Sequence, residues 1–187
     1  MLFRSLLCLF LSSCVKDDPP KIDDPEDEII ETNFTLTDFF SMEKPVTIEI
    51  FISDDELEKI NQDYYRFSEF DSKSPIYRMC DLVITYGEEE VYIKEVGIRM
   101  KGNTSRRDFY TKKDGIYNLV HFKISFKETF DDEDEYDQPK VWTDSTLRDQ
   151  RKDRKFLGME TLDLKWNKNY DATHVRQIYA YDKFREN

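Results

Sequence analysis

The 187-residue chain has three cysteines, two histidines and no long apolar run. No stretch approaches the roughly 18 to 20 apolar residues of a membrane-spanning helix, so we expect no bilayer-crossing segment. Cys8 and Cys14 lie at the N-terminus, which leaves Cys80 as the one cysteine of the folded part. An intramolecular disulfide is therefore excluded there. Cys80 stands in a strand-like run, 76–86, and we expect it to be a small core residue and not a nucleophile.

The shortage of histidine excludes further chemistries. His121 and His174 do not form a metal-ligand pair at helical spacing, and no Ser-His-Asp set is recognisable. The sequence also lacks GxGxxG and Walker motifs. The common signatures of zinc enzymes, serine hydrolases and P-loop proteins are thus missing, and we expect no nucleic-acid partner.

The N-terminus has the features of an export signal: a short positive region, an apolar run over 6–11 and a small-residue site. Leu11-Ser-Ser-Cys14 resembles the lipobox of bacterial lipoproteins, in which the cysteine is acylated and the chain is cut before it. Val15-Lys-Asp-Asp18 resembles the tag that sends some Gram-negative lipoproteins to the cell exterior. The resemblance implies an exported protein anchored by lipid on Cys14 to a bacterial membrane, at the outer membrane or cell surface. An ordinary secretory signal with an incidental Cys14 is the alternative.

The net charge of −12 comes from two segments. Residues 15–31 hold eight acids and two lysines, and residues 131–137 hold six acids and no base, so each contributes −6. The first also contains three prolines and few apolar residues, which predicts an extended tether. The second lacks the glycine and the closing glutamate of a calcium loop, so we interpret it as a solvated surface loop.

Residues 94–127 have the opposite bias, with nine bases and three acids. A binding site for an anion is one interpretation of this segment. The other is that these cations lie on solvent-facing sides of strands and balance the nearby acidic loop.

Apolar–polar alternation predicts strands over 46–52 and 119–127, with Phe122, Ile124 and Phe126 on one face and Lys123 on the other. Residues 76–86 and 90–101 are expected to form a hairpin, and 161–166 a further short strand. Helices are expected after the capping-box pattern at 53–56 and after a cap at Asp171. The pattern predicts an α+β fold, a mainly antiparallel sheet with flanking helices.

Four runs in a fixed order carry a family resemblance. They are Val96-Gly-Ile-Arg-Met-Lys-Gly-Asn-Thr-Ser-Arg106, His121-Phe-Lys-Ile-Ser-Phe-Lys127, Lys155-Phe-Leu-Gly-Met159 with Leu162-Asp-Leu-Lys-Trp166, and Asp171-Ala-Thr-His-Val-Arg-Gln-Ile-Tyr-Ala-Tyr-Asp182. Together they resemble the amino-terminal half of the spore coat protein H (CotH) kinase family, a group of atypical protein kinases.

The resemblance implies a kinase-like amino-terminal lobe that holds the phosphates of ATP, with Mg as the accompanying metal. Lys123 is the candidate phosphate-contacting lysine, and the other candidate nucleotide-binding residues are Arg99, Asn103, Ser105, Arg106 and Arg176. Residues 102–105 could point N–H groups and hydroxyls at an anion, but taken by themselves they are better explained as an ordinary hairpin turn, since Gly-Asn is a common turn pair. Gln177 stands where relatives often have an acid or an amide, and a glutamine can hydrogen-bond a lysine but cannot form an ion pair with it, so the resemblance does not establish a contact between Lys123 and this helix.

The family's catalytic and metal-binding carboxylates lie beyond the last residue of this chain, and none is carried over. We therefore expect a signal peptide at 1–13, a lipidated linker at 14–36 and a truncated CotH-like kinase domain at 37–187 that is inactive alone. In the full family, the activity is ATP-dependent phosphorylation of exported or surface proteins. The alternative is a non-catalytic surface lipoprotein that binds a glycan or partner protein through its cationic strands and aromatic residues, including Tyr64, Tyr65 and Phe67.

Overall fold

The computed structural model describes residues 30–41, 43–69, 72–102, 110–111, 116–117 and 120–165. Along the chain the elements are α1 (Leu36–Phe39), β1 (Val46–Phe51), α2 (Asp54–Ser68), β2 (Arg78–Tyr86), β3 (Glu89–Lys101), β4 (Tyr110–Thr111), β5 (Ile116–Tyr117), β6 (His121–Ser125), α3 (Ser145–Asp153) and β7 (Thr161–Leu164). Within this part of the chain, no helix is long and apolar enough to cross a membrane.

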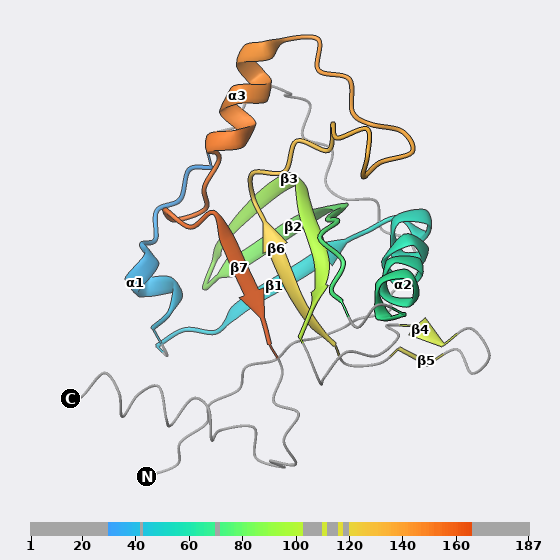
Figure 1. The fold of residues 1–187 in the computed structure, drawn as a ribbon. Coiled ribbons are helices and arrows are strands. Elements are labelled where there is room, and N and C mark those ends of the chain that lie inside the picture. The colour runs from blue at the N-terminus through green and yellow to red at the C-terminus, as the bar shows by residue number, and fades with distance from the viewer. Residues whose placement is uncertain are drawn as a thin grey trace.

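Five strands form one antiparallel sheet in the order β1-β2-β3-β6-β7, and β4 pairs with β5 in a separate ribbon. In the view of Figure 1, α1 lies to the left and α2 to the right of the strands, and α3 lies beyond one end of them. The predicted α+β class with a mainly antiparallel sheet is confirmed. The predicted helix after Asp171 lies outside the described residues, and α3 was not predicted.

The predicted hairpin is β2–β3, and it is the longest pairing in the sheet. Tyr86 pairs with Glu89, so Gly87 and Glu88 form a two-residue turn. Gly87 has a φ of 66°, a backbone conformation that favours glycine. Between Cys80 and Leu82 the register shifts by a bulge, opposite which Glu95 has a φ of 49°.

The start of α2 agrees with the predicted cap, because Ser53 Oγ accepts a hydrogen bond from Glu56 N at 3.2 Å. The Glu56 carboxylate also links the helix to the sheet, because it accepts from Met79 N at 3.1 Å as well as from Lys59 Nζ at 2.7 Å. Further along the helix, buried Asp63 accepts two 2.8 Å hydrogen bonds from Arg78. These contacts join α2 to the first residues of β2.

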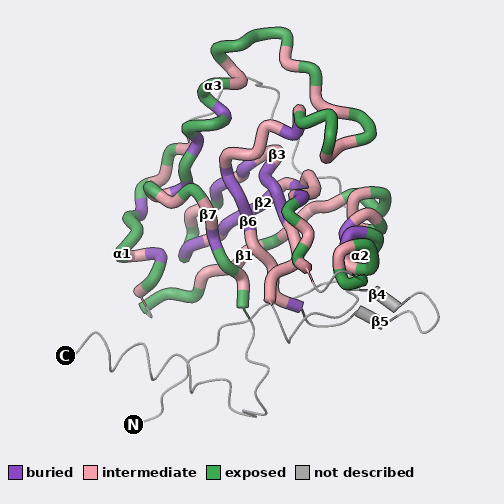
Figure 2. Tube along the Cα trace, viewed as in Figure 1, coloured by how far each residue is buried: buried purple, intermediate pink, exposed green. Residues whose placement is uncertain are grey.

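The core lies against one face of the sheet, and the buried positions of β2, β3 and β6 appear in purple in Figure 2. Its side chains on β6 and just beyond, Ile124 and Phe126, are fully buried, as the alternation predicts. Cys80 is 3% exposed, which confirms it as a core residue, and burial raises the pKa of its thiol. A buried thiol that resists ionisation is a poor nucleophile.

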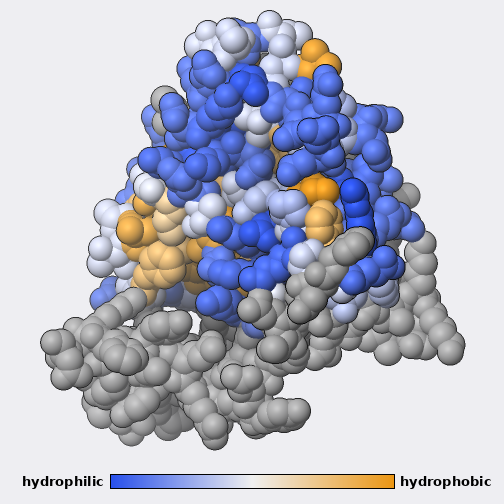
Figure 3. Space-filling view, in the orientation of Figure 1, coloured by the Kyte–Doolittle hydropathy of each residue, from blue (hydrophilic) through white to orange (hydrophobic). Residues whose placement is uncertain are grey.

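Aromatic side chains close the core beside α1. Phe34 is 5% exposed, and its ring centroid lies 5.0 Å from that of Tyr86 and 6.2 Å from that of Phe156. Phe34 belongs to the range 14–36 that the composition assigns to the linker. Figure 3 shows apolar side chains at the surface next to α1, where Leu36 and Phe40 are 44% and 46% exposed.

Two arginines of the α3 region attach it to the bulged part of β3. Arg154 is buried and donates hydrogen bonds to three backbone carbonyl oxygens, those of Phe126 (2.5 Å), Lys94 (2.8 Å) and Glu95 (2.6 Å). Arg151, also buried, donates to the Glu95 carboxylate at 2.9 Å. Buried cations are stable only when their donors are used in this way, so the pair has a structural role.

Candidate functional site

Charged side chains gather on the face of the sheet opposite the core. The apolar residues of β3, β6 and β7 pack on the core, so the residues between them point to the other face. On that face Arg99 of β3 pairs with Lys123 of β6, and Lys123 pairs in turn with Asp163 of β7. The predicted site residues Arg99 and Lys123 are thus next to each other, which their separation in sequence did not show.

The Arg99 guanidinium is held by two groups from the segment before β2. Its Nη1 donates to the carbonyl oxygen of Ser74 at 3.1 Å, and its Cζ lies 5.0 Å from the centroid of the Tyr77 ring. Its Nε is buried and has no hydrogen-bond partner among the described residues. The guanidinium is therefore fixed in place while part of its donor capacity is unused.

Lys101 lies two residues after Arg99 on the same face, and its ammonium group forms an ion pair with Asp163. In the part of the chain that the structure describes, Arg99 and Lys123 form no ion pair with a carboxylate, although Asp163 is the cross-strand neighbour of Lys123. The four charged groups Arg99, Lys101, Lys123 and Asp163 sum to +2, three positive charges and one negative. A half-buried surface with this excess can hold an anion of two negative charges, such as a phosphoryl group.

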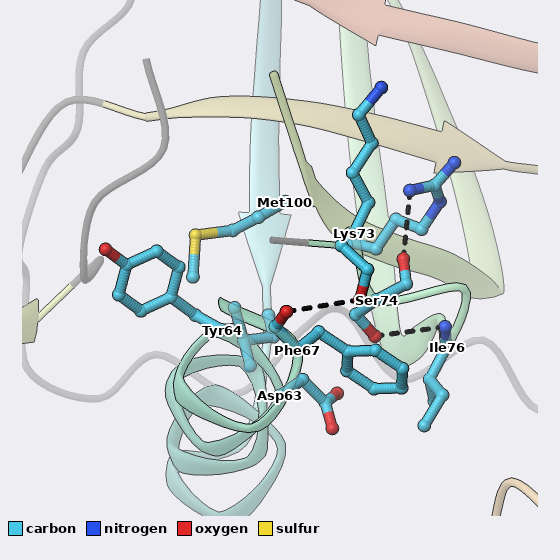
Figure 4. Close-up of a pocket in the computed structure, with 10 residues that line it drawn as sticks. Asp63, Tyr64, Phe67, Lys73, Ser74, Ile76 and Met100 are labelled. Atoms are coloured by element: carbon cyan, nitrogen blue, oxygen red, sulfur yellow. Dashed lines mark hydrogen bonds between the residues drawn. The ribbon is translucent and has the colours of Figure 1, made fainter. Parts of the chain in front are cut away.

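A small cavity lies between α2 and the segment that follows it (Figure 4). Its volume is about 20 Å³, and its lining is Ile60, Asp63, Tyr64, Phe67, Ser72, Lys73, Ser74, Ile76, Arg99 and Met100. Such a volume holds about one water molecule and cannot admit a sugar ring or a nucleotide base. The cavity therefore borders one side of the Arg99 side chain, and it is too small to be a ligand site itself.

A larger, open groove of about 510 Å³ runs along α3. Its lining is Ile30, Ser145, Thr146, Asp149, Gln150, Asp153, Arg154 and Lys155, none of which was predicted as a site residue. Arg154 is already engaged by three carbonyls, and the remaining charges are of both signs. The side chains that line this groove therefore do not point to a particular ligand.

The acidic segment 131–137 is largely exposed, as predicted for a surface loop: Asp132, Glu133, Asp134 and Asp137 all face solvent. Its two ends are attached to the fold. The Asp131 carboxylate pairs with Arg148, and the Tyr136 hydroxyl donates to the carbonyl oxygen of Tyr77 at 2.9 Å. Among the described residues, no three His, Cys, Asp or Glu side chains are grouped as a metal site.

Sequence reasoning missed the residues that support Arg99. Ser74 acts through a backbone carbonyl, which carries no side-chain signal, and Tyr77 was interpreted only as part of a strand. The predicted site residues Asn103, Ser105, Arg106 and Arg176, together with Cys14, lie outside the described residues. The site that can be built is therefore the Arg99–Lys123 pair with its neighbours.

Comparison with known proteins gives no relative for this chain: no protein-family profile, no curated protein and no solved structure matches it.

Proposed function

We propose that this chain supplies the nucleotide-binding lobe of a CotH-like protein kinase on an exported, lipid-anchored protein. The single observation that supports the proposal most is that Arg99 and Lys123 are cross-strand neighbours on one face of an antiparallel sheet and that neither forms an ion pair among the described residues. The family resemblance of residues 96–185 adds ATP as the ligand and an exported or surface protein as the substrate.

The physical requirement of phosphoryl transfer agrees with these residues. Negative charge on the phosphates must be neutralised, and little covalent chemistry is asked of the protein. Lys123 would contact the phosphates as a point charge, and the planar Arg99 group would bind phosphoryl oxygens through paired N–H donors. The Lys123 ammonium group and the Arg99 guanidinium together are therefore suited to bind a chain of phosphates.

The Mg²⁺ ion that the resemblance implies would supply further charge neutralisation at the phosphates. Since the described residues offer no cluster of ligands for it, we assign it no ligand in this part of the chain. The transfer step itself is likewise assigned to no residue here. What these residues would do is bind and orient the phosphates.

Calorimetric titration of the full chain with Mg-ATP tests the proposal. Wild type is expected to bind, and Lys123→Ala to weaken binding about tenfold, because one ion-paired hydrogen bond to phosphate is lost. Lys152→Ala is the matched control, since Lys152 is an exposed lysine of α3 and should leave binding unchanged. Absence of Mg-ATP binding in wild type would refute the nucleotide-lobe assignment.

A non-catalytic binding protein is the second candidate, and one observation favours it. The Tyr65 ring on α2 is 56% exposed, and its centroid lies 5.2 Å from that of Tyr64. Exposed aromatic pairs of this kind are common at binding surfaces. Titration with oligosaccharides from the bacterial surface would support this function if binding occurs in wild type and is lost in Tyr65→Ala.

A further inference from the structure

Tyr77 lies immediately before β2 and beside the proposed anion site. Its neighbour Arg78 pairs with Ile98, so continuation of this register by one residue brings Tyr77 next to Arg99. The contact is observed: the ring centroid of Tyr77 and the Cζ of Arg99 are 5.0 Å apart. A cation above an aromatic face at this distance is attracted by the ring quadrupole.

The place of the Tyr77 ring depends on the absence of a side chain at Gly97. A Cβ atom at Gly97 would lie 2.8 Å from Tyr77 Cβ, 3.1 Å from Tyr77 Cδ1 and 2.5 Å from Glu128 Cγ. Any larger residue would displace these side chains. Gly97 therefore provides the space in which the Tyr77 ring lies beside β3, within reach of Arg99.

The backbone of Tyr77 is held as well. The hydroxyl group of Tyr136, in the acidic segment, donates a hydrogen bond to the Tyr77 carbonyl oxygen at 2.9 Å. The Tyr136 ring in turn lies 5.8 Å from the ring of Phe130, which is buried. Tyr77 is thus fixed from both sides, by the sheet and by the segment that follows β6.

We propose that Tyr77 is a positioning residue, whose ring holds the Arg99 guanidinium in the orientation that recognises a phosphate oxyanion beside Lys123. The proposal rests on the proposed function for the identity of the ligand as a nucleotide. The ring and the Ser74 carbonyl together leave Arg99 with few rotamers, so little side-chain entropy is lost when an anion binds. Without the ring, Arg99 keeps its charge but loses its fixed orientation.

The experiment follows the ¹⁵N-labelled Nε–H resonance of Arg99 during titration of the full chain with inorganic pyrophosphate, and repeats the binding with Mg-ATP. In wild type and in Tyr77→Phe, which keeps the ring, we expect pyrophosphate to shift this resonance with similar midpoints. In Tyr77→Leu the midpoint should rise about three- to tenfold, the range that a cation–π contact accounts for. Phe40→Leu, which removes an exposed ring at the end of α1, is the control and should resemble wild type.

A double-mutant cycle distinguishes the proposed positioning of Arg99 by Tyr77 from a merely structural role of Tyr77. In an Arg99→Ala background, Tyr77→Leu should cause no further weakening, because the ring acts through Arg99. If Tyr77→Leu does not fold, Tyr77→Met takes its place: an unbranched apolar side chain fills the space beside Gly97 without a ring, and pyrophosphate binding should again weaken several-fold.

The outcomes distinguish this proposal from the proposed function. Pyrophosphate binding without Mg-ATP binding would refute the nucleotide-lobe assignment and leave the role of Tyr77 supported. Mg-ATP binding that Lys123→Ala weakens and Tyr77→Leu does not would refute the role of Tyr77 and leave the proposed function supported. An Arg99 resonance that does not respond to pyrophosphate in wild type would overturn the positioning role.

Discussion

Arg99 of β3 and Lys123 of β6 are direct cross-strand partners on the face of the sheet opposite the core. Like charges in direct opposition destabilise a sheet by a few tenths to about 1 kcal/mol. Neither one forms an ion pair with a carboxylate among the described residues, because Asp163, the other cross-strand neighbour of Lys123, is ion-paired with Lys101. A bound anion would remove this repulsion, which is why the pair indicates a binding surface more strongly than either residue alone.

Asp163→Asn is expected to tighten Mg-ATP binding about two- to fivefold, because it removes a negative charge next to Lys123 and frees the Lys101 ammonium group. The comparison is by calorimetry at low salt, with Asp149→Asn on α3 as a control whose carboxylate is exposed. The stability of the variant should change little, since the Lys101–Asp163 pair is partly solvated. Weaker binding in Asp163→Asn would contradict the view that the polar face attracts an anion.

Arg154→Ala should lower the free energy of unfolding by about 3–5 kcal/mol, because three backbone carbonyl oxygens lose their buried donor. Urea denaturation monitored by circular dichroism measures the change. Lys152→Ala, two residues earlier and exposed, should stay within about 0.5 kcal/mol of wild type. If Arg154→Ala lost less than about 1 kcal/mol, the attachment of α3 to β3 would not depend on this side chain.

The lowered pKa of the Glu95 carboxyl predicts that the free energy of unfolding depends on pH. Burial by itself raises the pKa of the Glu95 carboxyl, but the hydrogen bond and charge of Lys140 and the charge of Arg151 outweigh burial, so the pKa is lowered below its ordinary 4.5. The stability that this carboxylate contributes is therefore present above the ordinary value and is lost as the pH falls through the lower folded-state pKa.

Glu95→Gln should accordingly cost about 1–2 kcal/mol at pH 7, and its difference from wild type should shrink as the pH falls below about 4.5. Urea midpoints between pH 7 and pH 3 give this comparison, with the exposed Glu133→Gln as control. A difference that stayed constant across this range would mean that the Glu95 charge does not contribute to stability.

Cys14 is the residue through which we propose that the protein is anchored to a membrane. Metabolic labelling with a fatty-acid analogue should mark the wild-type chain and not Cys14→Ser, because we propose the Cys14 thiol as the acylated group. Cys8→Ser should still be labelled, since Cys8 lies inside the proposed signal peptide, before the proposed cleavage site. Equal labelling of wild type and Cys14→Ser would leave an ordinary secretory signal as the explanation of the N-terminus.

Local patterns were sufficient for much of the sheet. The alternation at 46–52 and 119–127 predicted β1 and β6, and Tyr86-Gly-Glu-Glu predicted the β2–β3 turn, because both depend on neighbours in sequence. Ser53 predicted the start of α2 for the same reason. Helix α3 was missed because its nine residues, Ser145–Asp153, are almost all polar and show no apolar stripe.

The sequence by itself determined that Lys123 lies on the polar side of its strand and that Cys80 lies in the core, since side chains alternate along a strand with a period of two. Only the tertiary structure decided that Lys123 has Arg99 on one side and Asp163 on the other, because strand order depends on how distant segments pack. The same holds for Tyr77, whose contact with Arg99 spans 22 positions of sequence. Such contacts follow from the burial of the whole core, which no local pattern encodes.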